Sequence, residues 1–264
     1  MKKLIRLGDR LNAFTFGYED SLLNEIRASF IKDLGFLRNP TNQFLFKGGR
    51  RFFQPVGNYF LVSSGDSPLL WFSASTPETF GLFQNFFDRL EIAEDLKQLI
   101  DFDQKIVLYS GFFVIGAHLP KPMWHLDYYA GANGFTLITP LHDIAAEHES
   151  LWYLSDKFEG ALEGDLSDQR QVKTYRYTRN EAIVLGDHFY HSTKPYAYSG
   201  SMRVLVSLTM GTDKLEYWPI LARTLAKQTN YVILPCGHLM GSCQCLEGLS
   251  SAAGTGPDEI EAGS

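Results

Sequence analysis

The chain has 264 residues, of which 45% are hydrophobic and 20% charged, so it can bury a sizeable core in one large domain. Its formal net charge of -6 gives no general attraction to phosphate backbones or anionic lipids, which argues against nucleic acid and membrane surfaces as partners. Asp9 and Arg10 interrupt the first apolar run, and no stretch approaches the roughly 20 apolar residues of a membrane span. We therefore expect a cytoplasmic protein.

The N-terminal hundred residues combine helices with short strands. Residues 21–34 place apolar side chains at helical spacing, which predicts an amphipathic helix. Thr76-Pro77-Glu78 predicts the start of a second helix that runs to about Ile100, because a hydroxyl can cap the helix and proline fits its first turn. Four short runs between these helices are expected to be strands joined by tight turns: Gln43–Phe46, Arg51–Phe53, Tyr59–Val62 and Leu69–Phe72.

From Lys105 onward the sequence consists of short runs of β-forming residues separated by Gly, Pro and Asn. This pattern predicts a β-sandwich or barrel, with residues 140–171 as an inserted loop region and a last helix from Trp218 to Gln228. The expected fold class is mainly β with flanking helices. The predicted strands are Ile106–Tyr109, Phe112–Ile115, Trp124–Tyr129, Phe135–Thr139, Lys173–Tyr177, Ala182–Leu185 and Met202–Met210.

We interpret residues 1–235 as a single domain. Residues 1–104 would support a barrel core formed by 105–211, and 212–235 would add the C-terminal helix. Residues 236–264, rich in Gly, Ser, Ala and acidic side chains, are expected to be a flexible tail. This tail carries all three cysteines, and Cys236-Gly-His238 with Cys243-Gln-Cys245 supplies enough soft ligands for zinc. Their close spacing in a low-complexity segment nevertheless favours reduced, unbound thiols.

His125 and Asp127 are the first candidates for chemistry. They are two residues apart in a run with strand character, so both side chains are expected on one face, with Leu126 on the other. A charged aspartate inside a barrel is costly unless it binds a cation or forms an ion pair. The pair therefore favours a metal site.

A second histidine and an arginine follow on later strands. Residues 181–185 form a predicted strand that reaches a glycine turn and then presents His188 and His191. Alternation along this segment favours His191 as the side chain that faces His125, and leaves His188 pointing away. Arg203 and Ser207 share one face of the next strand, so a fixed cation lies near the distal histidine.

The ordered set His125-x-Asp127, His191 and Arg203 resembles the signature of the Fe(II)/2-oxoglutarate-dependent dioxygenase superfamily. The resemblance covers roughly 105–211 and implies a double-stranded β-helix, a jelly-roll or cupin-like core. It also implies that His125, Asp127 and His191 hold Fe(II) as a facial triad. Arg203 would then bind the distal carboxylate of the co-substrate 2-oxoglutarate, with Lys194 as the alternative anchor and Ser207 or Tyr109 adding a hydroxyl.

The function that this resemblance implies is hydroxylation of an unactivated C–H bond of a small molecule, with dioxygen consumed and succinate and CO2 released. Asp127 favours this outcome over halogenation, because related halogenases carry a small residue in place of the carboxylate. Two alternatives remain: a hydroxylase of protein or peptide side chains, with residues 141–171 as the docking surface, and a non-redox cupin-like metal-binding protein. Neither the substrate nor the oligomeric state follows from the sequence.

Overall fold

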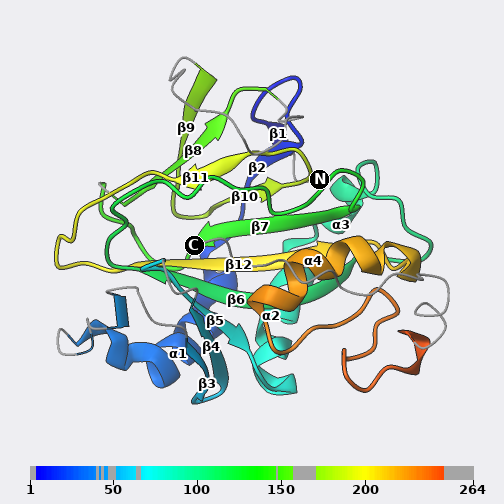
Figure 1. The fold of residues 1–264 in the computed structure, drawn as a ribbon, viewed down its shortest axis with the longest axis horizontal. Coiled ribbons are helices and arrows are strands. Elements are labelled where there is room, and N and C mark those ends of the chain that lie inside the picture. Colours follow the sequence, from blue (N-terminus) through cyan, green and yellow to red (C-terminus); the bar gives the residue numbers. More distant parts are fainter. Residues whose placement is uncertain are drawn as a thin grey trace, which may run out of the picture.

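The computed structural model describes residues 4–39, 42, 45–46, 52–63, 67–146, 148–156 and 171–246. Within these ranges, no helix is long and apolar enough to cross a membrane. The strands form two antiparallel sheets, a large one that crosses the whole molecule and a small one beside it (Figure 1).

The large sheet has the strand order β1-β2-β10-β7-β12-β6-β5-β4-β3 within the described residues. Its centre is the pair β6 and β12, which are long and almost entirely buried. The strands are β1 (Ile5–Arg6), β2 (Ala13–Gly17), β3 (Phe52–Val56), β4 (Tyr59–Ser63), β5 (Leu70–Ala74), β6 (Val107–Gly116), β7 (Gly134–Pro140), β10 (Glu181–Leu185) and β12 (Arg203–Gly211).

The small sheet has the order β11-β8-β9, with β8 (Ser150–Leu154), β9 (Val172–Arg176) and β11 (His191–Thr193). Its side chains pack against those of the large sheet: Leu151 and Tyr153 of β8 belong to one buried cluster with Ile138 of β7 and Leu205 of β12. Two antiparallel sheets thus enclose a shared core, as a jelly roll requires.

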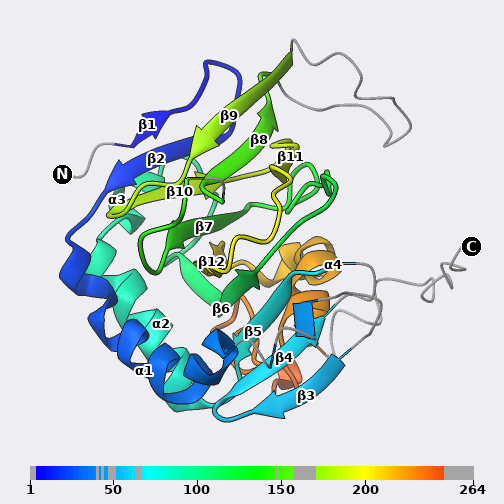
Figure 2. The same ribbon diagram turned by 90° about the vertical axis from the view of Figure 1, so that its left-hand side faces the viewer.

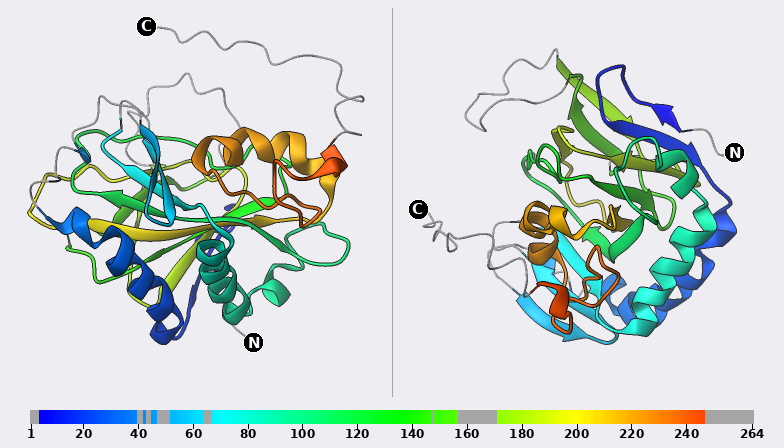
Figure 3. Two further views of the ribbon diagram at one scale, coloured as in Figure 1. Left: turned by 90° about the horizontal axis from the view of Figure 1, so that it is seen from below. Right: turned by 90° about the vertical axis from the view of Figure 1, so that its right-hand side faces the viewer.

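Helices cover the large sheet on both sides. The helices α1 (Asn24–Leu34) and α2 (Pro77–Leu90) lie along one side, and α4 (Trp218–Gln228) lies on the opposite side (Figures 2 and 3). Phe30 of α1 and Phe83 of α2 both contact the ring of Phe113 on β6, which anchors the two helices to the sheet. The side chain of Thr76 accepts a hydrogen bond from the Thr79 amide, so the predicted capped start of α2 is confirmed.

Several element boundaries differ from the sequence predictions. The second helix ends at Leu90 because Glu91 adopts a left-handed conformation with φ of 55°, and only the short helix α3 (Ala93–Leu96) follows it. The predicted strands 106–109 and 112–115 form one continuous strand, β6. The strand β8 lies inside the expected loop region.

In the N-terminal part, Leu45 and Phe46 of a predicted strand adopt a 3-10 conformation, and the Gly48-Gly49 turn lies outside the described residues. The C-terminal segment is also more ordered than predicted. Residues 236–246 of the expected tail are folded, with Cys236, Met240 and Cys243 packed against a buried cluster, and 247–264 lie outside the described residues.

Close packing against α2 explains why a glycine, Gly111, stands in the middle of β6. A Cβ atom at this position would collide with the ring of Phe83, so only glycine lets α2 approach the sheet this closely.

We expect Gly111→Ala to lower the free energy of unfolding by about 1–3 kcal/mol, measured by urea denaturation. The control Gly81→Ala lies in α2 with nothing near the added carbon, and should raise stability by up to about 1 kcal/mol. Equal effects of the two substitutions would contradict this explanation.

Candidate metal centre

His125 and His191 come from distant segments that backbone hydrogen bonds hold side by side. The His125 amide donates to the His191 carbonyl at 2.9 Å, and the His191 amide donates to the His125 carbonyl at 3.0 Å. His191 begins β11, whereas His125 makes only this isolated bridge. The predicted strand Trp124–Tyr129 is therefore wrong, but a single bridge is enough to bring both imidazoles to one place.

Asp127 lies against both imidazoles. Its Oδ1 is 3.4 Å from Nε2 of His125 and 3.8 Å from Nε2 of His191. Ligand atoms of all three residues lie within 4.8 Å of one another. Two imidazoles and one carboxylate, gathered this closely, can bind one face of an octahedral ion and leave its other positions open.

Both histidines are oriented by the nitrogen that faces away from Asp127. Nδ1 of His125 donates to the Met123 carbonyl at 2.8 Å, and Nδ1 of His191 donates to the Phe189 carbonyl at 2.9 Å. A backbone carbonyl can only accept, so each imidazole carries a proton on Nδ1, and Nε2, on the side of Asp127, is the nitrogen left to bind a metal. The three side chains thus have the arrangement that metal binding needs.

The charges of the buried groups agree with this arrangement. Burial, followed by repulsion from His125, lowers the pKa of His191 to about 4, so this imidazole is neutral at neutral pH. Burial alone would raise the pKa of Asp127, but His191 and the hydrogen bond from His125 hold it well below its usual range. Burial lowers the pKa of His125, but the hydrogen bond and charge of Asp127 raise it overall, so a divalent cation that binds its Nε2 would displace a proton.

Arg203 is the unusual residue near this centre. Its side chain is fully buried, with 1% of the residue exposed, and its Nη2 donates to Thr193 Oγ1 at 3.1 Å. Within the described part of the chain, its Nε and Nη1 have no hydrogen-bond partner. The guanidinium also lies 5.4 Å from the ring centroid of Tyr196. A buried cation with two unused donors is costly to the fold, and an anion that supplied the missing acceptors would offset that cost.

The metal triad and Arg203 line the same cavity, which has a volume of about 90 Å³. Apolar side chains from β6, β7, β8 and β12 form much of its wall, including Phe112, Val114, Ile138, Leu151 and Leu205. The cavity therefore places the buried Arg203 guanidinium beside the three candidate metal ligands, within a largely apolar wall.

Comparisons with known proteins agree with this architecture. No protein-family model matches the sequence, and no curated protein does. Among solved structures, AviO1 from Streptomyces viridochromogenes Tue57 is 14% identical, with 76% of this chain and 90% of that chain covered, at a TM-score of 0.51. SnoN from nogalamycin biosynthesis, a non-haem alpha-ketoglutarate-dependent epimerase, is 10% identical, with 77% of both chains covered, at a TM-score of 0.50.

The chain has the jelly-roll fold of the 2-oxoglutarate-dependent enzymes. This confirms the predicted fold class and, at the level of the fold, the resemblance to that superfamily. Identities this low do not carry chemistry from one protein to another, so the function has to be argued from the residues that line the cavity.

The two residues predicted to assist Arg203 lie in different places. Ser207 is buried and lines the cavity two positions beyond Leu205 on β12. Tyr109 does not line it: a register shift between β6 and β12 occurs beside it, and its ring packs under α4 in a cluster with Tyr128. The Tyr109 hydroxyl donates to the Thr212 carbonyl at 2.6 Å. We therefore leave Tyr109 out of the proposed site.

The alternative ligands do not reach the cavity. His188 adopts a left-handed backbone conformation with φ of 59°, and its Nε2 is 3.9 Å from Asp187 Oδ2 instead of facing Asp127. Lys194 is exposed and is absent from the cavity wall. Between the alternatives raised from the sequence, His191 and not His188, and Arg203 and not Lys194, thus lie in the cavity with His125 and Asp127.

Tyr177 and Thr193 line the cavity but were not predicted. Tyr177 follows β9, and burial raises the pKa of its hydroxyl to about 12, so it stays protonated and can donate a hydrogen bond. The sequence signal was the alternation of Tyr175 and Tyr177, which places both rings on one side of a strand. That pattern does not say which tyrosine reaches the core and which reaches a cavity.

Proposed function

We propose that this chain is a non-haem Fe(II)- and 2-oxoglutarate-dependent oxygenase. In this proposal His125, Asp127 and His191 hold the iron, and Arg203 binds the distal carboxylate of 2-oxoglutarate. The observation that carries it is the buried Arg203 guanidinium, with two unused donors, in the same cavity as the triad. A triad alone also suits a non-redox cupin-like protein, but a buried cation beside it calls for an anionic co-substrate.

When bound, iron and 2-oxoglutarate supply oxidative chemistry in which dioxygen is consumed, the keto acid becomes succinate and CO2, and a substrate C–H bond is hydroxylated. The chain's own residues position these groups. The planar Arg203 guanidinium can bind both oxygens of a carboxylate and so set the direction of the keto acid. Ser207 and Tyr177 place hydroxyls in the cavity wall, and Phe112 and Leu205 give it apolar surface.

The substrate is proposed to approach from the side of His125. The side chain of His125 is 50% exposed, whereas that of His191 is 4% exposed, so the centre opens in one direction. Trp124 and Tyr190, the chain neighbours of His125 and His191, stack with 5.5 Å between their ring centroids. Because the cavity itself is small, the co-substrate would fill most of it, and the oxidised molecule would lie on the exposed side of His125. This arrangement supports a small-molecule substrate.

Addition of Fe(II) and then 2-oxoglutarate without oxygen is expected to produce a weak visible charge-transfer band. The band requires the keto acid to bind iron directly, so absorption spectroscopy tests the metal site and the co-substrate together. The Asp127→Ala protein should show no band. Absence of the band from intact, iron-loaded protein would refute the oxygenase proposal. Tight zinc binding without turnover of 2-oxoglutarate would favour the cupin-like alternative.

The substrate class is tested by succinate release. Amino acids, other carboxylates and natural-product scaffolds are screened beside peptides, with Fe(II), 2-oxoglutarate and oxygen present. Stimulation by free small molecules and not by peptides is the expected result. Stimulation by peptides alone would replace the small-molecule proposal with a side-chain hydroxylase of the same fold, and mass analysis of the product separates hydroxylation from desaturation or ring formation.

A further inference from the structure

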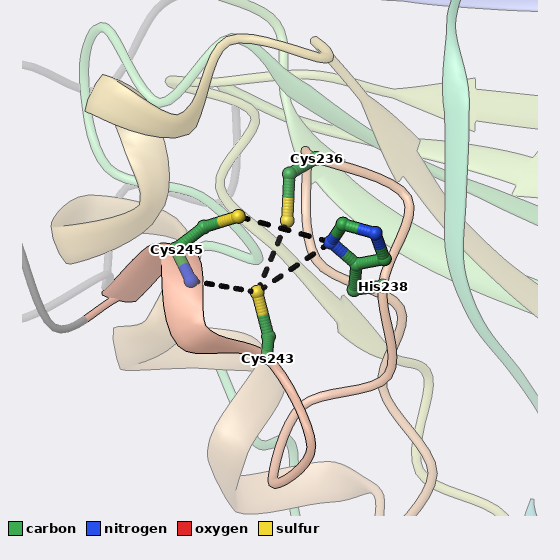
Figure 4. Close-up of side chains that lie close together, drawn as sticks. All are labelled: Cys236, His238, Cys243 and Cys245. Carbon is green, nitrogen blue, oxygen red and sulfur yellow. Dashed lines mark hydrogen bonds between the residues drawn. The ribbon is translucent and has the colours of Figure 1, made fainter.

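Four side chains with soft ligand atoms face one another near the end of the described chain. They are Cys236, His238, Cys243 and Cys245, and their ligand atoms all lie within 4.8 Å of one another (Figure 4). Cys236 Sγ is 3.5 Å from Cys243 Sγ. Nδ1 of His238 is 3.7 Å from Cys243 Sγ and 3.8 Å from Cys245 Sγ. Figure 4 shows the four side chains converging on one small space from two turns of the backbone.

These spacings match the edges of a zinc tetrahedron. With Zn–S bonds of about 2.3 Å and Zn–N bonds of about 2.0–2.1 Å, tetrahedral geometry puts two sulfur atoms about 3.8 Å apart and a sulfur and a nitrogen about 3.6 Å apart. Three of the six edges are matched here, by separations of 3.5, 3.7 and 3.8 Å. Three sulfurs and one imidazole nitrogen are also a usual ligand set of structural zinc.

The backbone builds the site from a small hairpin. Ile233 pairs with Leu239 as an isolated bridge, and the Leu234 amide donates to the His238 carbonyl at 2.8 Å. Gly237, between the first two ligands, has a φ of +82°, a conformation that other residues rarely adopt. The hairpin therefore presents Cys236 and His238 from either side of a glycine turn.

The second pair of ligands follows on a short turn. The Cys245 amide donates to Cys243 Sγ at 3.3 Å, and such an amide favours the thiolate form that binds metal. A disulfide explains the cluster less well. The Cys236 and Cys243 sulfurs are farther apart than the roughly 2.05 Å of an S–S bond, and pairing them would leave Cys245 and His238 without a role.

We propose that Cys236, His238, Cys243 and Cys245 bind one structural zinc ion. Binding of Zn²⁺ releases the three thiol protons and forms three Zn–S bonds and one Zn–N bond, with no change of oxidation state. All four positions of the tetrahedron are then filled by protein, so the ion has no open position for substrate and serves to hold the fold. This site is separate from the iron site, and it stands whether or not the proposed oxygenase function is correct.

The zinc site would hold residues 236–245 beside the buried cluster that supports the proposed iron site. On the first arm of the hairpin, Val232 and Leu234 are fully buried in a cluster with Tyr109 and Tyr128. The Ile233 amide donates to the Tyr109 carbonyl at 2.8 Å, and Tyr128 directly follows Asp127 in the sequence. Closing the hairpin with zinc thus stabilises the packing that supports the segment carrying Asp127.

Metal analysis of protein with the iron site removed tests this proposal. The variant His125→Ala/Asp127→Ala is loaded with zinc under reducing conditions and desalted, and it should retain one zinc ion per chain. Adding Cys243→Ser and Cys245→Ser should remove that ion. Adding Gln244→Ser instead should leave it in place, because Gln244 is exposed between the two cysteines and is no ligand.

Zinc K-edge absorption of the same His125→Ala/Asp127→Ala protein gives an answer even if the cysteine variants fail to fold. Three sulfur neighbours and one nitrogen neighbour are expected. Nitrogen and oxygen neighbours only, or no retained zinc in this variant, would overturn the proposal. Removal of zinc with a chelator should also speed hydrogen exchange at residues 232–234, and unchanged exchange there would contradict the stabilising role.

Discussion

Asp127→Ala is expected to abolish succinate formation and to weaken Fe(II) binding by at least about 100-fold. Loss of a partner behind a ligand typically costs 10- to 100-fold in metal affinity, and removal of the ligand itself should cost no less. Asp127 is also the only anionic member of the triad, so its removal leaves two neutral imidazoles to bind a divalent cation. Iron binding is measured by titration under anaerobic conditions, and turnover by succinate release.

A matched control for this substitution is Asp156→Ala. Asp156 forms an ion pair with Arg10 at 3.1 Å, but both side chains are largely exposed, and exposed pairs contribute little to stability. This variant should bind iron and form succinate as the intact protein does. Full iron affinity in Asp127→Ala would mean that the carboxylate is no ligand, and would leave the triad without its charged member.

The residues that the fold gathers at the proposed iron site could be picked out from the sequence because they follow a short, ordered pattern. His125 and Asp127 are two residues apart, and His191 and Arg203 stand in a fixed order after them. The strand expected around His125 does not form, and a single backbone bridge between His125 and His191 brings the two imidazoles together. By contrast, nothing local shows that Tyr177 reaches this cavity, because that depends on how β9 pairs with β8.

Long-range packing also explains the errors in the predicted fold. Gly111 favours a break between strands when read locally, yet the approach of Phe83 demands glycine in the middle of β6. The strand β8 was missed because its partners, β9 and β11, come much later in the chain. The soft ligands at the chain end lie in a segment with the composition of a tail, and only the pairing of Ile233 with Leu239 brings them together.

Arg203→Ala is expected to raise the KM for 2-oxoglutarate by roughly 100-fold or more while leaving Fe(II) affinity nearly unchanged. Truncation of one partner of a buried, hydrogen-bonded charge pair costs about 2–5 kcal/mol, and Arg203 is proposed to contact only the co-substrate. The KM of Arg203→Lys for 2-oxoglutarate should lie between those of the intact protein and Arg203→Ala, because an ammonium keeps the charge but loses the planar pair of donors. Equal losses of iron and 2-oxoglutarate affinity would show that the anchor is misassigned.

Arg203→Met separates this role from simple packing, because it should change stability and binding in opposite directions. Without co-substrate, the buried guanidinium has two donors with no partner among the described residues, so a methionine of similar length should stabilise the metal-free protein by about 1–3 kcal/mol. With Fe(II) present, 2-oxoglutarate at 100 times its dissociation constant should stabilise the intact protein by about 2.7 kcal/mol, and it should hardly affect Arg203→Met. Urea denaturation with and without co-substrate measures both effects. A variant that loses stability in both conditions would show that Arg203 acts through packing, because a residue retained for an anion is costly to the fold until that anion arrives.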